Sequence, residues 1–182
     1  MDGKRLLVLS DTHGHVSALE AVLCWAGDRE LSGGISAAVF LGDGAADLPR
    51  AANKTGFCSE WKIVRGNNDF DSQIQDTAVF DFGGHRFFLC HGHRYAIYNG
   101  YHSLIAAARK NEADAALFGH THTPYYKNEN NILLINPGSA GRPRSRIGST
   151  FAVIECEQGK PLDVKFWEIG PYKEIREITV KK

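Results

Sequence analysis

Seven side chains of metal-binding type stand out in this sequence because each closely follows a short apolar run. They are Asp11, His13, Asp43, Asn67, His91, His120 and His122. Carboxylate and amide oxygens combined with imidazole nitrogens suit borderline divalent ions, and seven such groups are enough for two ions. The cysteines do not cluster, which argues against a structural zinc site. We therefore expect the metals to be catalytic.

Two neighbouring ions would support a defined chemistry. A pair roughly 3.5 to 4 Å apart can share one carboxylate, lower the pKa of a bridging water and clamp a phosphoryl group for in-line attack. Asp43 is the candidate for the shared carboxylate. Gly42 and Gly44 flank it, and they allow the backbone to turn sharply beside the metals.

The position of these residues indicates the elements that must hold them. Each group follows a run typical of a buried strand, and the runs cover residues 6–9, 38–41, 61–64, 87–90 and 115–118. Open α/β sheets bind ligands at the carboxyl ends of their strands. The loops after these five strands are therefore expected to form one composite site.

The remaining pattern predicts how the chain is folded. Apolar residues spaced by three and four predict a helix that starts near Val16 and ends near Gly33–Gly34, and residues 47–56 are expected to hold another. The opening thus reads β-α-β-α-β, which implies parallel strands. Further expected elements are a hairpin of 78–82 and 86–89, a helix over 101–108, and strands over 132–135, 151–154, 163–167 and 175–180. We predict an α/β fold of two stacked mixed β-sheets flanked by helices, in a single domain spanning residues 1–182.

Composition limits the partners and the compartment. The 182 residues include 21 Lys and Arg against 21 Asp and Glu, so no net charge attracts nucleic acid or an anionic membrane. Cys24, Cys58, Cys90 and Cys156 are scattered, which favours free thiols. We expect neither a signal peptide nor a membrane span. We expect a cytoplasmic protein.

The order of the motifs carries a resemblance to a known family. The motifs are Asp11-Thr12-His13, Gly42-Asp43, Gly66-Asn67-Asn68-Asp69, His91-Gly92 and Gly119-His120-Thr121-His122. Together they resemble the calcineurin-like metallophosphoesterase family, and its small YfcE-like phosphodiesterase branch in particular. The short chain and Asn136-Pro137-Gly138-Ser139 also fit that branch.

This resemblance implies an αββα sandwich and a binuclear centre. One metal would be held by Asp11, His13, Asp43 and His122, and the other by Asp43, Asn67, His91 and His120. It also implies hydrolysis of phosphodiester bonds by a metal-bridging hydroxide. Mn²⁺ is the expected ion, with Ni²⁺, Fe²⁺, Co²⁺ or Zn²⁺ as alternatives.

Three further residues are candidates for substrate contact. Many members of the superfamily have a histidine directly after the metal-binding asparagine, and the small branch commonly has a cysteine, but this chain has Asn68. Asn68 can donate a hydrogen bond to a phosphoryl oxygen but cannot act as a general acid. We therefore expect modest activity that favours good leaving groups. His93 could contact substrate or orient a ligand, and Arg144 could bind a phosphate.

Other functions compete with the phosphodiesterase. A phosphomonoesterase or nucleotide phosphatase would use the same ligands and differ only at the rim of the pocket. A scaffold protein resembling the retromer subunit of this fold would not need seven clustered ligands. The expected partner is a small-molecule phosphodiester, since the neutral charge disfavours nucleic acid. The exposed strand edges of a two-sheet fold allow a homodimer.

Overall fold

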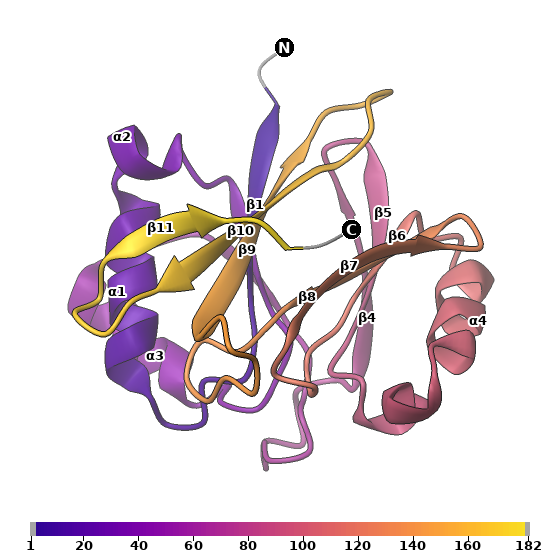
Figure 1. The fold of residues 1–182 in the computed structure, drawn as a ribbon, viewed down its shortest axis with the longest axis horizontal. Coiled ribbons are helices and arrows are strands. Elements are labelled where there is room, and N and C mark those ends of the chain that lie inside the picture. The colour runs from indigo at the N-terminus through magenta and orange to yellow at the C-terminus, as the bar shows by residue number, and fades with distance from the viewer. Residues whose placement is uncertain (1–2, 181–182) are drawn as a thin grey trace.

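Two mixed β-sheets packed face to face form the centre of the molecule, which we describe from a computed structural model covering residues 3–180. The first sheet has the order β11-β10-β9-β1-β2-β3 and the second has the order β4-β5-β6-β8-β7. In Figure 1, α1 and α3 cover the outer face of the first sheet, and α4 covers the outer face of the second. The predicted fold class is therefore confirmed.

The first half of the chain builds the parallel part of the first sheet. Its elements are β1 (Lys4–Leu9), α1 (Val16–Gly27), α2 (Arg29–Ser32), β2 (Ala37–Phe40), α3 (Asp47–Thr55) and β3 (Glu60–Ile63). As expected, β1 pairs in parallel with β2, and β2 pairs in parallel with β3. The carboxyl ends of these three strands therefore lie at one edge, where the first three predicted ligand loops begin.

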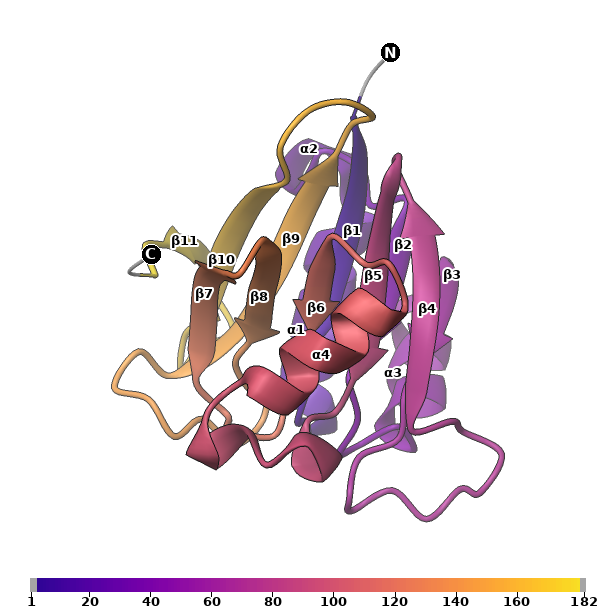
Figure 2. The same cartoon turned by 90° about the vertical axis from the view of Figure 1, so that its right-hand side faces the viewer.

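The middle of the chain forms the second sheet. Its elements are β4 (Thr77–Phe82), β5 (His85–Cys90), the short 3-10 helices η1 (His93–Tyr95) and η2 (Ile97–Asn99), α4 (His102–Lys110), β6 (Ala115–Leu117), β7 (Pro124–Glu129) and β8 (Ile132–Pro137). β4 and β5 form the predicted antiparallel hairpin, while β5, β6 and β8 are parallel neighbours. Figure 2 shows α4 lying across this sheet.

The chain then returns to the first sheet and completes it. β9 (Ser149–Cys156), β10 (Asp163–Ile169) and β11 (Ile175–Ile178) form an antiparallel meander beside β1. The last strand was predicted to cover residues 175–180, but β11 ends two residues earlier, at Ile178. No helix among residues 3–180 combines the length and hydropathy that a bilayer span requires.

Successive side chains of a strand point to opposite faces of the sheet, so the core is divided into layers. In β1, Leu7 and Leu9 face the helices, whereas Leu6 and Val8 face the second sheet. All four are fully buried. Because successive residues of a strand point to opposite faces, a strand covered on both sides is apolar throughout. This explains why the strands that carry the site appear as continuous apolar runs.

Candidate metal centre

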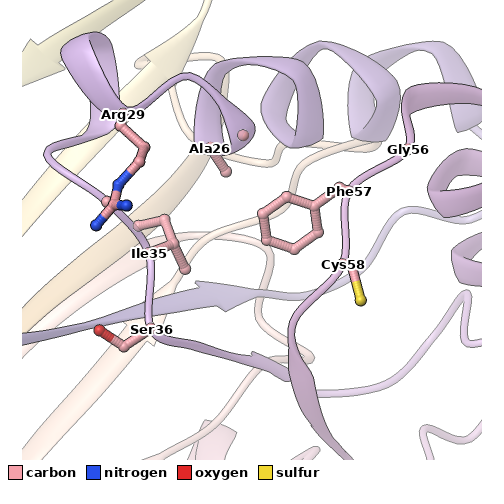
Figure 3. A pocket seen from close by; sticks show the side chains of 9 residues that line it. Ala26, Arg29, Ile35, Ser36, Gly56, Phe57 and Cys58 are labelled. Atoms are coloured by element: carbon pink, nitrogen blue, oxygen red, sulfur yellow. The ribbon is translucent and has the colours of Figure 1, made fainter.

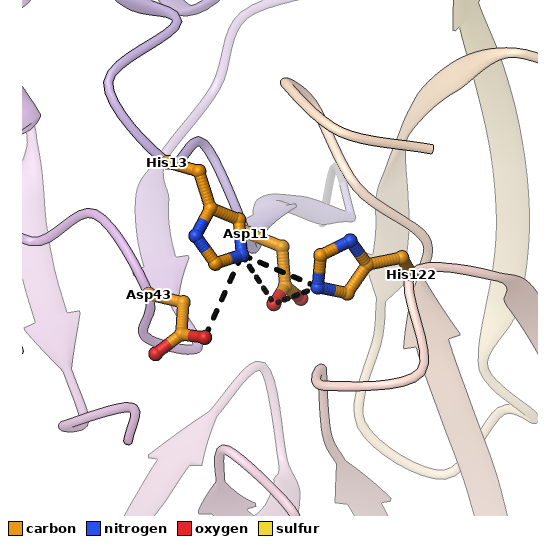
Figure 4. A group of neighbouring side chains, drawn as sticks. All are labelled: Asp11, His13, Asp43 and His122. Atoms are coloured by element: carbon orange, nitrogen blue, oxygen red, sulfur yellow. Dashed lines mark hydrogen bonds and ion pairs between the residues drawn. The ribbon is translucent and has the colours of Figure 1, made fainter. Parts of the chain in front are cut away.

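Asp11, His13, Asp43 and His122 converge where the two sheets meet at the ends of their strands. One ligand-type atom from each lies within 4.8 Å of those from all the others, as Figure 4 shows. Asp11 and His13 follow β1, Asp43 follows β2, and His122 lies in the loop between β6 and β7. Segments far apart in sequence thus form one cluster, as the sequence predicted for these four residues.

The Nε2 atoms of the two histidines in the cluster lie close to each other and to the Asp11 carboxylate. His13 Nε2 and His122 Nε2 are 3.2 Å apart, and His122 Nε2 is 3.1 Å from Asp11 Oδ1. His122 Nδ1 donates to the carbonyl of Arg142 at 2.5 Å. That bond occupies Nδ1 and turns Nε2 toward the carboxylates, which is the usual way a metal-binding imidazole is oriented.

His91 approaches the same carboxylates from β5 in the second sheet. Its Nδ1 donates to the carbonyl of Leu41 at 2.7 Å. Its Nε2 lies 3.4 Å from Asp43 Oδ2 and 3.9 Å from Asp11 Oδ1. The His120 ring is 5.1 Å from the His91 ring, and the backbone N–H of His120 donates to Asp11 Oδ2. Both residues therefore border the cluster.

Two buried polar atoms test whether this cluster suits a metal. Asp11 Oδ1 and His91 Nε2 are shielded from solvent, and although each lies near an oppositely charged group, neither makes a hydrogen bond. Such orphaned atoms are costly in a folded protein and call for an explanation. Divalent cations bound at this cluster would satisfy these atoms, since carboxylate oxygen and unprotonated imidazole nitrogen are ligand atoms. The residues present therefore fit a metal.

The backbone at the cluster is strained where the ligands lie. Among residues 3–180, ten residues other than glycine have positive φ, and five of these belong to the predicted ligand set. Those five are Asp11, His13, Asp43, His120 and His122. Left-handed conformations of such residues cost about 1–3 kcal/mol each and concentrate at functional sites. The strain supports a functional role for these loops.

Burial and charge shift the pKa values within the cluster in opposite directions. Burial raises the pKa of Asp11, but His122, His13 and His91 outweigh it and lower that pKa to about 2. Burial likewise raises the pKa of Asp43, and His91 with Asn68 lowers it overall. Both carboxylates are therefore ionised at neutral pH, as metal binding requires.

The histidines of the site differ in the direction in which their pKa values are shifted. Burial lowers the pKa of His91, but the neighbouring Asp43 and Asp11 carboxylates raise it overall. Burial and the positive His91 lower the pKa of His120 to about 4, and the same two causes lower the pKa of His93. His120 and His93 are accordingly neutral at pH 7.

The two asparagines after β3 differ in their surroundings. Asn68 donates from its backbone N–H to Asp43 Oδ1 at 2.7 Å and from Nδ2 to Asp43 Oδ2 at 2.6 Å. Asn67 lies in the same loop, and both asparagines are exposed. The structure thus brings Asn68 into direct contact with the cluster, while Asn67 remains a predicted ligand.

The other two predicted substrate contacts lie at the rim. His93 begins η1, and its ring centroid is 5.4 Å from that of His91. Arg144 is exposed and donates to the Tyr98 hydroxyl at 3.0 Å. Arg144, Arg142, His13, His122 and Asn68 line a polar hollow of about 550 Å³. A phosphate in this hollow would meet both the cluster and cationic groups.

Tyr98 and Asp69 support the site, although neither is among the predicted site residues. The Tyr98 hydroxyl donates to the carbonyl of His120 at 3.1 Å, so it connects a ligand loop to Arg144. The Asp69 carboxylate accepts four backbone N–H groups, from Asp43, Gly44, Ala45 and Gly66. The carboxylate directly after Asn67-Asn68 was a signal for such a cap. Tyr98 was only one of three nearby tyrosines that could line the mouth of a pocket, and ordinary packing is the commoner explanation for such residues.

Another hollow of about 550 Å³ lies away from this cluster. Its lining includes Arg29, Ser36, Phe57 and Cys58 (Figure 3). Ser36 and Cys58 precede β2 and β3, so this hollow opens at the amino ends of the parallel strands. The ligand loops leave from the opposite ends.

Comparison with known proteins agrees with this geometry. The profile of the calcineurin-like phosphoesterase superfamily domain matches residues 5–159. The phosphodiesterase YfcE of Escherichia coli K12 is 26% identical over 172 residues, covering 83% of this chain and 87% of YfcE. A Bacillus subtilis protein named probable metallophosphoesterase YsnB is 25% identical over 152 residues, covering 84% of each chain.

Solved structures show the same architecture. A predicted phosphoesterase from Streptococcus pneumoniae TIGR4 superposes with a TM-score of 0.75 at 28% identity, covering 98% of both chains. A Vps29 mutant from Entamoeba histolytica has a TM-score of 0.74 at 20% identity, covering 96% of this chain and 99% of its own, which shows likeness of fold alone. With its family profile matched over most of its length and an Asp and His cluster suited to a metal, this chain belongs to the calcineurin-like phosphoesterase superfamily.

Proposed function

We propose that this protein is a metal-dependent phosphodiesterase that hydrolyses small-molecule phosphodiesters at a binuclear centre. The observation that carries the proposal is that Asp11, His13, Asp43 and His122 bring ligand atoms within 4.8 Å of one another. Asp11 Oδ1 in this group and the neighbouring His91 Nε2 are buried and have no hydrogen-bond partner. Similarity to a named phosphodiesterase supports the reaction class. Mn²⁺ is the proposed ion.

The resemblance to the family implies two ligand sets that share Asp43. Asp11, His13, Asp43 and His122 would hold one ion, and Asp43, Asn67, His91 and His120 would hold the other. When bound, two such ions supply a nucleophile from water at neutral pH and stabilise charge on the phosphoryl group. The short distances from Asp43 Oδ2 to His13 and to His91, 3.5 and 3.4 Å, support its role as the shared ligand.

The chain's own side chains would position the phosphoester. Arg144 presents a guanidinium held by the Tyr98 hydroxyl, and guanidinium groups bind phosphoryl oxygens through paired hydrogen bonds. Asn68 offers an amide N–H but no titratable proton, so the leaving group must depart without protonation by that residue. Esters with good leaving groups are the expected substrates.

The proposal is tested with metal-stripped protein and bis(4-nitrophenyl) phosphate, measured before and after addition of Mn²⁺. Activity should appear only with metal and fall by at least about 100-fold in Asp43→Asn, since the shared ligand is lost. Asp163→Asn is the matched control, because Asp163 is exposed on β10. Hydrolysis of 4-nitrophenyl phosphate in preference to the diester would instead favour a phosphomonoesterase. Full binding of Mn²⁺ without hydrolysis of either ester would contradict both reactions.

A further inference from the structure

An apolar hollow adjoins the metal-ligand cluster on the side away from Arg144. Its volume is about 500 Å³, which is within the range of pockets for small ligands. It lies among α3, the end of β3 and the loop of residues 66–76. Its lining includes Ala45, Leu48, Pro49, Ile63, Phe70 and Ile74.

Asn68 joins this apolar hollow to the proposed active site. Asn68 lines both the apolar hollow and the polar hollow that contains His13, His122 and Arg144. Its Nδ2 donates to Asp43 Oδ2 at 2.6 Å. The apolar hollow therefore begins one side chain away from the proposed shared carboxylate, within the reach of a substituent on a phosphoryl group bound there.

Phe70 adds an exposed aromatic ring to the lining of this hollow. Its side chain lines the hollow and is nevertheless 95% exposed. A phenyl ring in water gains free energy when an apolar partner removes it from solvent. The loop that carries it extends from the body of the molecule between β3 and β4 (Figure 2). Phe70 is thus placed to close over a group lying in the hollow.

Charge distinguishes the two sides of the site. Arg142 and Arg144 line the polar hollow, whereas the charged residues that line the apolar hollow are Asp69 and Asp71. Asp69 is bonded to four backbone N–H groups, and Asp71 is exposed. An anionic substituent would be repelled on the apolar side, while an uncharged apolar one would be accepted.

We infer that the substrate is a phosphoester with an uncharged aromatic or branched aliphatic substituent, which binds in the apolar hollow beneath Phe70. Phe70 and Ile74 then determine specificity for that substituent. The inference rests on the proposed function, because it assumes that the phosphoryl group binds at the metal-ligand cluster.

Phosphonates test the inference without turnover, because they keep one substituent and have no ester bond to cleave. The dissociation constants of methylphosphonate and phenylphosphonate are measured by calorimetry on Mn²⁺-loaded protein. Phenylphosphonate should bind at least about tenfold more tightly in the wild type, because its ring is removed from water. This preference should disappear in Phe70→Ala and shrink in Ile74→Ser, with methylphosphonate binding unchanged.

Tyr172→Ala is the matched control, since Tyr172 is 92% exposed but lies outside the hollow. This variant should keep the preference for phenylphosphonate. Equal affinity of the wild type for both phosphonates, or a preference that survives Phe70→Ala, would overturn the inference and leave the proposed function intact. Failure of methylphosphonate to bind the metal-loaded protein would count against the phosphoryl site itself.

Discussion

At the scale of single residues, Asp69 organises the site without being one of its predicted ligands. Its two carboxylate oxygens receive N–H groups from the Asp43 loop and from Gly66 in the next ligand loop. Hydrogen bonds to a charged acceptor are the stronger kind. The position of Asp43 therefore depends on a residue that is 26 positions away.

Asp69→Asn should weaken Mn²⁺ binding by about 10- to 100-fold, the usual effect of changing a residue that orients ligands. The asparagine amide turns a donor toward backbone N–H groups that need an acceptor. Calorimetric titration of metal-free protein with Mn²⁺ checks this. Asp71→Asn, in the same loop and exposed, should retain wild-type affinity, and equal losses in the two variants would argue against the positioning role.

The cysteines should react in two classes. Cys24 and Cys58 are exposed, whereas Cys90 and Cys156 are buried. Burial raises the pKa of Cys156 to about 12 and also raises the pKa of Cys90, so neither presents a thiolate. Titration with a chromogenic disulfide should modify two thiols rapidly in the native protein and four after denaturation. Rapid loss of all four would contradict this arrangement.

The residue types of the cluster could be predicted, but their contacts could not. Asp11, His13, Asp43 and His122 were recognisable because ligand chemistry follows buried strands. The hydrogen bond from Tyr98 to the carbonyl of His120 joins two loops. Such a contact depends on how η2 lies against the second sheet, and no local pattern encodes it.

At the scale of elements, the ends of β2 and β3 approach each other closely enough to require glycine. Gly42 has a φ of 91°, and a Cβ there would lie 2.4 Å from the backbone nitrogen of Gly66. The loops of Asp43 and Asn67 are thereby held in backbone contact. This contact places two predicted ligands side by side.

Gly42→Ala should destabilise the protein more than Gly56→Ala. Both positions have positive φ, but a Cβ at Gly56 would meet nothing within 4 Å. The left-handed backbone costs about 1–2 kcal/mol in either variant, and the clash at Gly42 adds about 1–3 kcal/mol. Urea denaturation measures both free energies of unfolding. An equal decrease in the free energy of unfolding in the two variants would show that the loops can move apart without an energetic cost.

The sequence predicted the buried apolar strands but not the polar strand at the edge of the second sheet. Leu6 to Leu9 and the other buried runs form strands as expected, because strands covered on both faces are continuously apolar. β7 was missed since Lys127 and Asn128 make it a polar edge strand. Asn130 and Asn131, with φ of 52° and 63°, form the turn that joins it to β8, and this pair was its available signal.

At the scale of the whole molecule, the cluster joins the two sheets. Asp11 and Asp43 extend from strands of the first sheet, whereas His91 and His122 extend from the second. A ligand bound only by the folded state stabilises it by mass action. A metal held between the sheets would therefore stabilise the packing of one sheet on the other.

Metal should raise the melting temperature, and the increase should grow with pH. Protonated His91 stabilises the metal-free fold below its unfolded pKa of 6.5, and that contribution is lost as pH rises through its raised folded pKa. Metal requires the unprotonated ring, so it binds more tightly over the same range. Thermal unfolding with and without Mn²⁺ between pH 6 and 8.5 provides the measurement. A metal-induced rise in melting temperature that is the same at every pH would contradict this prediction.

The five predicted ligands in left-handed conformations also bear on how such a protein evolves. Replacement of His13, Asp43 or His122 by glycine would relieve backbone strain of about 1–3 kcal/mol at that position. If these residues hold the proposed metals, loss of the site would increase the stability of the metal-free fold, and only selection for activity would oppose that loss. Descendants released from that selection would drift toward a more stable sandwich without metal chemistry, whose surface is then free to acquire other partners.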